Sequence, residues 1–220
     1  MAKSAWYRIP FYFVGLSALL ISTALPSLAQ GGLVSIVIVR HPETDTSQSD
    51  KPVVPLSEVG RARAALLAHT LKDIKFTHMF ASHTTRSRDA ITELAAIHNL
   101  AIVQLPQPGS MIDGKPVTDQ TSRRAPIEPL SKALMELPAG SVALVGLNSE
   151  NIYAILNRLG VPRAAEGQSC SRGSMCVPCD SNSCFPAEFD HVWHLLRDKA
   201  RKEPVALFEF RYGAGWKAPQ

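Results

Sequence analysis

The sequence lacks several features that mark particular classes of protein. Across its 220 residues, 23 Lys and Arg stand against 19 Asp and Glu, and no basic run is interleaved with aromatic residues. This distribution lacks the electrostatic footprint of a nucleic-acid-binding protein, so we expect no nucleic-acid partner. Charged residues make up 19% of the chain and hydrophobic residues 45%, which excludes a disordered tail.

Cysteine is scarce, and all four cysteines fall in one short segment. A chain of this length buries roughly 70% of the surface that its unfolded state exposes, so its core needs no disulfide or metal in order to form. The cysteines therefore have a local purpose. We expect one domain over residues 30–220, carrying a cysteine-rich insert at about residues 168–186.

Only one apolar run approaches the length of a membrane span, and it lies at the N-terminus. Lys3 and Arg8 precede an uncharged stretch over residues 9–25, and a small-x-small pattern follows at residues 27–29. This order predicts a secretory signal peptide over residues 1–29. The alternative is an uncleaved membrane anchor, although the run is short for a span of about 20 residues. We expect an exported protein, periplasmic or secreted, with no membrane contact after cleavage.

From residue 33 onward, short β-branched runs alternate with amphipathic segments. The apolar run at residues 34–39 is typical of a central strand covered on both faces. Further strands are predicted at 78–81, 102–105, 142–145, 192–196 and 205–211, the last two at an edge, and helices at 57–73, 86–97, about 127–137 and 152–160. The alternation predicts an α/β three-layer sandwich, a mainly parallel sheet flanked by helices on both faces. Ligands bind at the carboxyl ends of the strands in such folds.

Two of the predicted helices carry details that a structure can test. Ser57 is the expected N-cap of the first, since serine side chains accept hydrogen bonds from the first turn. The segment at residues 86–97 is predicted as one helix whose buried face includes Ile91, Leu94 and Ile97.

The loop after the first strand carries the strongest candidates for chemistry. An unpaired buried guanidinium is very costly, so Arg40 and His41 at the end of this strand should line a cleft. A phosphoryl group spreads charge over three oxygens, and the planar fork of arginine holds two of them. Arg86 supplies a second fork at a predicted helix start, where free N–H groups favour an anion. A neutral His41 imidazole between these cations can attack phosphorus.

Four ordered motifs resemble those of the histidine phosphatase superfamily, which is also called phosphoglycerate mutase-like. Residues 40–44 resemble its Arg-His signature at the end of the first strand. Residues 55–60 resemble its Pro-Leu-Ser/Thr-x-x-Gly helix start, and residues 82–86 its Ser-x-x-x-Arg motif. Residues 188–190 and 211–213 are similar to the closing strands of small exported members.

The resemblance implies both a fold and a function. It implies the phosphoglycerate mutase-like fold and hydrolysis of a small phosphomonoester through a phosphohistidine on His41, with Arg40 and Arg86 as catalytic phosphate clamps. The expected ligands are a small phosphorylated substrate and inorganic phosphate, with no cofactor and no metal. The alternative is a catalytically inactive relative that binds phosphorylated ligands or a protein partner through the same pocket.

The superfamily's second histidine, which normally follows a strand in a Gly-His context, is absent. Gly146 is followed by Leu147 and Asn148, and the segment is one residue longer than expected, so either residue could occupy the histidine's place. An amide can donate a hydrogen bond to a phosphoryl oxygen, which makes Asn148 a phosphate-binding candidate. Losing such a donor costs about 10²–10³ in rate. His83 in the neighbouring loop is a candidate to replace the missing histidine. The alternative is that His83 is an ordinary surface loop residue.

Glu150 and Asp113 are the candidates for a general acid, because both lie in polar loops expected near the cleft. Solvated loop carboxylates are the alternative for both. Glu43, beside the motif, is expected to orient its loop instead. Pro42 removes a backbone N–H next to the anion site.

The cysteines are Cys170, Cys176, Cys179 and Cys184. In an oxidising compartment, an even count predicts two disulfides, with three pairings open. A four-cysteine zinc site usually shows two close pairs, and only one is present here, so disulfides are favoured over metal. A redox role is disfavoured because no thioredoxin-like placement surrounds the Cys-x-x-Cys pair. We expect a stapled loop at the rim of the cleft, used for substrate selection or for a protein contact.

Overall fold

The computed structural model describes residues 32–48, 50–51, 53–121, 126–164, 175–178, 186–201 and 204–213. The predicted signal peptide lies outside these residues, as do Cys170, Cys179 and Cys184. Cys176 is described and carries no free thiol. The signal peptide and the pairing of the cysteines therefore stay predictions. Within the described part of the chain, no helix is long and apolar enough to cross a membrane.

A six-stranded sheet forms the middle layer. Its strands are β1 (Leu33–Arg40), β2 (His78–Ala81), β3 (Ile102–Gln104), β6 (Val142–Leu147), β7 (His191–Asp198) and β8 (Pro204–Arg211), in the order β3-β2-β6-β1-β7-β8. The first four strands of this order run parallel to one another, whereas β7 is antiparallel to β1 and β8 is antiparallel to β7. The prediction of a mainly parallel sheet is confirmed. Of the last two strands, both predicted at an edge, only β8 lies at one, because β7 pairs with β1 inside the sheet.

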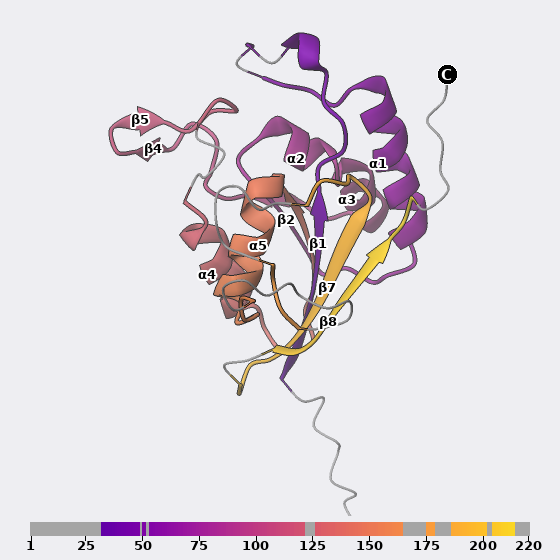
Figure 1. The fold of residues 1–220 in the computed structure, drawn as a ribbon, viewed down its shortest axis with the longest axis vertical. Coiled ribbons are helices and arrows are strands. Elements are labelled where there is room, and N and C mark those ends of the chain that lie inside the picture. Colours follow the sequence, from indigo (N-terminus) through magenta and orange to yellow (C-terminus); the bar gives the residue numbers. More distant parts are fainter. Residues whose placement is uncertain are drawn as a thin grey trace, which may run out of the picture.

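Helices cover both faces of the sheet (Figure 1). The elements besides the sheet are η1 (Thr46–Gln48), α1 (Glu58–Leu71), α2 (Thr85–Asp89), α3 (Thr92–His98), a hairpin of β4 (Met111–Ile112) and β5 (Lys115–Pro116), α4 (Glu128–Glu136) and α5 (Ser149–Arg158). One buried cluster joins the sheet to α4 and α5, and the other joins it to α1 and α3. The three-layer α/β prediction is confirmed, and β1 contributes side chains to both cores.

The helix predicted over residues 86–97 is two helices, and this part of the prediction is wrong. The Ile91 N–H bonds to the Arg88 carbonyl three residues back, so the chain tightens between α2 and α3. The break changes the phase of the buried face. Ile91 and Leu94 are buried as expected, but Ile97 is 51% exposed. The first helix follows its prediction more closely, since the Ser57 hydroxyl caps it by accepting from the Gly60 N–H at 3.0 Å.

Close packing of α2 on β6 leads to a prediction for Gly146. A Cβ at this position would lie 2.3 Å from the carbonyl oxygen of Ser87, so the backbone of α2 must move. We expect Gly146→Ala to lower the free energy of unfolding by about 1–3 kcal/mol. It should also lower turnover, because Arg86 adjoins the displaced residue. Urea unfolding with a parallel activity assay measures both effects.

The matched control is Gly32→Ala, where the nearest atom to an added Cβ lies at 3.4 Å, which is near ordinary contact distance. Equal stability of the two variants would contradict this account of how α2 is placed.

Candidate active site

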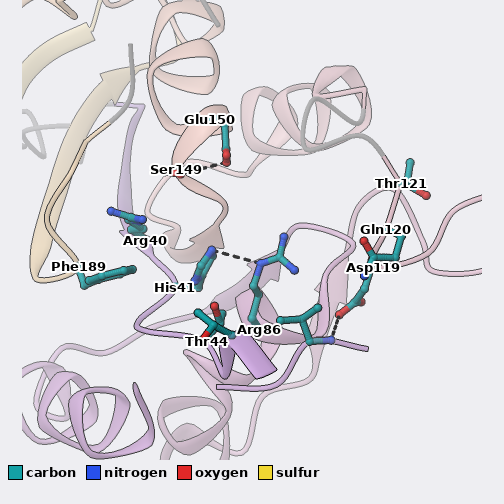
Figure 2. Close-up of a pocket in the computed structure, with 12 residues that line it drawn as sticks. Arg40, His41, Thr44, Arg86, Asp119, Gln120, Thr121, Ser149, Glu150 and Phe189 are labelled. Carbon is teal, nitrogen blue, oxygen red and sulfur yellow. Dashed lines mark hydrogen bonds between the residues drawn. The ribbon is translucent and has the colours of Figure 1, made fainter. Parts of the chain in front are cut away.

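A cavity of about 410 Å³ opens at the carboxyl ends of β1 and β6 (Figure 2). The residues that line it come from six separate parts of the chain: Arg40, His41, Thr44, Thr46, Val54, Arg86, Asp119, Gln120, Thr121, Ser149, Glu150 and Phe189. The fold thus brings Arg40, His41, Arg86 and Glu150 into one cavity. This edge of the sheet is where open α/β folds bind their ligands.

His41 is held in a single tautomer by its two neighbours. Its Nδ1 lies 2.7 Å from the carbonyl oxygen of Pro42, and because a carbonyl only accepts, Nδ1 carries the proton. On the other side of the ring, the Arg86 Nε–H donates to His41 Nε2 at 3.3 Å (Figure 2). A guanidinium only donates, so Nε2 holds a lone pair. The imidazole is therefore neutral, with its nucleophilic nitrogen beside a cation in the cavity.

Arg86 is 8% exposed and stands in the first turn of α2. The start of this helix is held by Asp119, whose Oδ1 accepts from the Thr85 N–H at 2.9 Å and from its hydroxyl at 3.1 Å. The other oxygen of Asp119 accepts from the Val54 N–H at 3.2 Å. The expectation of a free helix start is therefore wrong at Thr85, since Asp119 already takes that N–H. Asp119 fixes α2, and with it Arg86, against two other segments.

Arg40 lines the cavity, but its guanidinium holds a neighbouring segment. Its Nη1 donates to the carbonyl oxygens of Pro186 and Ala187 at 2.9 and 2.5 Å. The guanidinium carbon stacks 4.0 Å from the centre of the Phe189 ring. Burial lowers the pKa of Arg40, and the nearby carboxylate of Glu150 acts against that shift.

The two arginines therefore differ in what their side chains contact. Figure 2 shows the Arg40 side chain directed toward Phe189, while Arg86 is directed toward His41. Both line one cavity, as the sequence predicts, but only Arg86 contacts the imidazole.

Comparison with known proteins agrees with this geometry. A family model described as the histidine phosphatase superfamily (branch 1) matches residues 36–107, the part of the chain that holds His41 and Arg86. This part of the chain is similar to the histidine phosphatase superfamily. The fructose-2,6-bisphosphatase TIGAR of Bos taurus is 39% identical over 62 residues, a match that spans 26% of this chain and 23% of that protein.

Several solved structures share the fold. The protein histidine phosphatase SixA, in complex with tungstate, matches with a TM-score of 0.54 at 15% identity, over 84% of this chain and all of that one. A mycobacterial glucosyl-3-phosphoglycerate phosphatase matches with a TM-score of 0.51 at 15% identity, over 85% of this chain and 100% of that one. A phosphoglycerate mutase from Bacillus anthracis matches with a TM-score of 0.50 at 13% identity, over 80% of this chain and 92% of that one. These likenesses establish the phosphoglycerate mutase-like fold.

Neither candidate for the place of the superfamily's second histidine reaches the cavity. Leu147 ends β6 and is fully buried in the core beneath α4 and α5. Asn148 is also fully buried, and its Oδ1 accepts from the hydroxyls of Thr84 and Ser87 at 3.2 and 3.4 Å. Asn148 does not line the cavity, and its phosphate contact stays a prediction. The next residue, Ser149, lines the cavity, and the sequence analysis missed it.

The two candidate acids are separated by the fold. Glu150 lines the cavity, and its Oε2 accepts from the Ser149 hydroxyl at 3.0 Å (Figure 2). Asp113 is exposed at the turn of the β4–β5 hairpin and does not line the cavity. Glu150 is thus the better placed acid. Among the described residues, no group of three or more His, Cys, Asp or Glu could hold a metal ion.

Glu43 has the contacts that a loop-orienting residue needs. Its carboxylate is gripped by Arg63, whose Nε and Nη2 donate to Oε1 at 3.0 and 2.6 Å. Its backbone carbonyl accepts from the Ser57 N–H at the start of α1. A Cβ at position 60 would lie 2.0 Å from that carbonyl oxygen, so Gly60 permits the close approach. The motif loop is thereby fixed to α1.

His83 is neither a surface residue nor part of the cavity lining. It is 1% exposed, so the prediction of a surface loop residue is wrong, and its ring does not replace the missing histidine in the cavity. Desolvation by burial lowers the pKa of His83, a shift that the charge of Asp119 opposes and the charge of Arg86 reinforces.

This depressed pKa predicts how stability changes with pH. The unfolded chain takes up the His83 proton near its ordinary pKa of 6.5, whereas the folded chain takes it up only at lower pH. The stability that the chain has with a neutral His83 is therefore fully present above pH 6.5, and it is lost as the pH falls below that value. We expect His83→Gln to show a flatter decline in unfolding free energy between pH 7 and 5 than the parent chain. Replacing the exposed His69 in the same way is the control, and identical slopes for parent and His83→Gln would contradict the assignment.

Proposed function

We propose that this protein is an exported phosphatase that hydrolyses a small phosphomonoester through a phosphohistidine on His41. The observation that carries the proposal is the fixed tautomer of His41. A lone pair on Nε2 beside the Arg86 guanidinium is what an attack on phosphorus requires. A cavity of about 410 Å³ suits a small phosphorylated substrate.

In the first step, His41 Nε2 forms a bond to phosphorus and the ester P–O bond breaks. The Glu150 carboxylate relays the proton of a monoanionic phosphomonoester to the departing oxygen. The phosphorylated ring keeps its Nδ1 proton, which the Pro42 carbonyl accepts as a hydrogen bond at 2.7 Å. Arg86 holds the equatorial oxygens, where the charge collects.

In the second step, a water oxygen bonds to phosphorus while the P–Nε2 bond breaks. The Glu150 carboxylate accepts the proton of this water and passes it to the inorganic phosphate that leaves. The cycle returns both His41 and Glu150 to their starting protonation states. All the proton transfers use groups that line the same cavity.

The second candidate is an inactive relative that binds phosphorylated ligands, and the missing second histidine favours it. Assays of the purified chain with p-nitrophenyl phosphate and a panel of phosphomonoesters separate the two. The proposed enzyme turns over slowly and binds phosphate. Phosphate binding without any turnover supports the binding protein and overturns the enzyme.

Export and the disulfides are part of the same proposal. The charge-flanked apolar run supports cleavage after residue 29, and four clustered cysteines in an oxidising compartment support two disulfides. N-terminal sequencing of the secreted chain tests the first. Thiol titration of the denatured, unreduced chain tests the second, with four free thiols as the contradicting result.

A further inference from the structure

The place of the second histidine poses a specific question, because neither Leu147 nor Asn148 reaches the cavity. We propose that the Ser149 hydroxyl supplies the phosphoryl-oxygen hydrogen bond on this side of the site. The inference rests on the proposed function, since it names a further residue that touches the phosphoryl group.

Strand register places Ser149 close to His41. Arg40 of β1 pairs with Leu147 of β6, and the His41 N–H donates to the Leu147 carbonyl at 2.9 Å. The chain that leaves β6 after Leu147 therefore starts beside the nucleophile. Figure 2 shows Ser149 at the start of α5, above His41 in that view.

The burial and orientation of the neighbouring side chains leave this role to Ser149. Asn148 precedes α5 at its N-cap position, yet its side chain makes no capping bond because Thr84 and Ser87 hold it. Ser149 is 5% exposed and lines the same cavity as His41 and Arg86. A hydroxyl in this position is largely removed from solvent, where a hydrogen bond to a charged oxygen is stronger than in water.

The Ser149 hydroxyl has a hydrogen-bond partner that it would exchange for a phosphoryl oxygen when substrate binds. The Ser149 hydroxyl donates to Glu150 Oε2 at 3.0 Å. Rotation about a single side-chain bond redirects the donor from this carboxylate to a phosphoryl oxygen. Ser149 and Glu150 thus divide the work, one binding the phosphoryl group and the other moving protons.

The test compares Ser149→Ala with Ser149→Thr, which keeps a hydroxyl. We expect Ser149→Ala to lower kcat with p-nitrophenyl phosphate by about 10²-fold, the usual loss of one oxyanion donor. Its binding of tungstate, measured by calorimetry, should weaken by about 10-fold or more. Ser149→Thr should recover most of both. The control is Ser131→Ala, a serine on α4 that is 3% exposed and lies outside the cavity lining, for which both values should stay unchanged.

Each outcome bears on one claim. Wild-type kcat and tungstate affinity in Ser149→Ala overturn the inference, while the proposed function stands if turnover still depends on His41. If the parent chain shows no turnover, the proposed function fails, and tungstate affinity alone decides the role of Ser149. Thermal unfolding of each variant establishes that the chain is folded, as alanine is a strong helix former at the start of α5.

Discussion

His41→Ala is expected to abolish turnover while leaving oxoanion binding largely intact. The imidazole Nε2 is the protein atom that bonds to phosphorus in the proposed mechanism, so its removal should cost about 10³–10⁶ in kcat. Arg86 and Ser149 remain in the cavity, and phosphate or tungstate should still bind. Steady-state kinetics with an aryl phosphate and calorimetry with tungstate measure the two effects separately.

His41→Ala is informative because it should change turnover without changing oxoanion binding. A loss of both would indicate that the cavity had collapsed, which thermal unfolding detects independently. Turnover at the parent rate in His41→Ala would remove the phosphohistidine from the mechanism.

Arg86→Ala is expected to lose both turnover and oxoanion binding. This guanidinium is the cation that touches His41, and it also keeps a lone pair on Nε2 by donating to it at 3.3 Å. Removing an arginine that stabilises a transferring phosphoryl group costs about 10³–10⁵ in rate. Arg86→Lys keeps the charge but loses the fork, so it should recover only part of the loss.

Arg88→Ala is the matched control for Arg86. Arg88 stands two residues later in α2, is exposed, and pairs with Asp89 at the surface at 2.7 Å. Exposed ion pairs of this kind contribute little, so the control should behave as the parent does. Full activity in Arg86→Lys would show that only charge matters at this position.

The position of Arg40 and His41 could be predicted from the sequence because it depends on a single strand. The uninterrupted apolar run of β1 placed that strand inside the sheet and placed Arg40 and His41 at its carboxyl end, because buried strands cannot hold an unpaired guanidinium. Ser57 and the apolar spacing of α1 were equally readable, since capping and helical periodicity are local properties.

The parts that the sequence analysis missed depend on contacts between distant segments. Asp119 belongs to a polar loop with no motif, and only the fold shows that it fixes the start of α2. No sequence pattern distinguishes Ser149 from Leu147 and Asn148, because the side that each of them faces depends on how the chain passes from β6 into α5. The direction of the Arg40 guanidinium depends on the backbone of residues 186–187, some 146 positions away, and no local pattern reports it.

Trapping the covalent intermediate tests the central claim most directly. The parent chain is mixed with excess phosphomonoester, quenched in alkali during steady turnover, and digested for mass spectrometry, since phosphohistidine survives alkali but not acid. The account predicts a phosphoryl group on His41, absent from His41→Ala and reduced in Arg86→Ala. Steady turnover with no phosphorylated His41, or with the label on another residue, would contradict it.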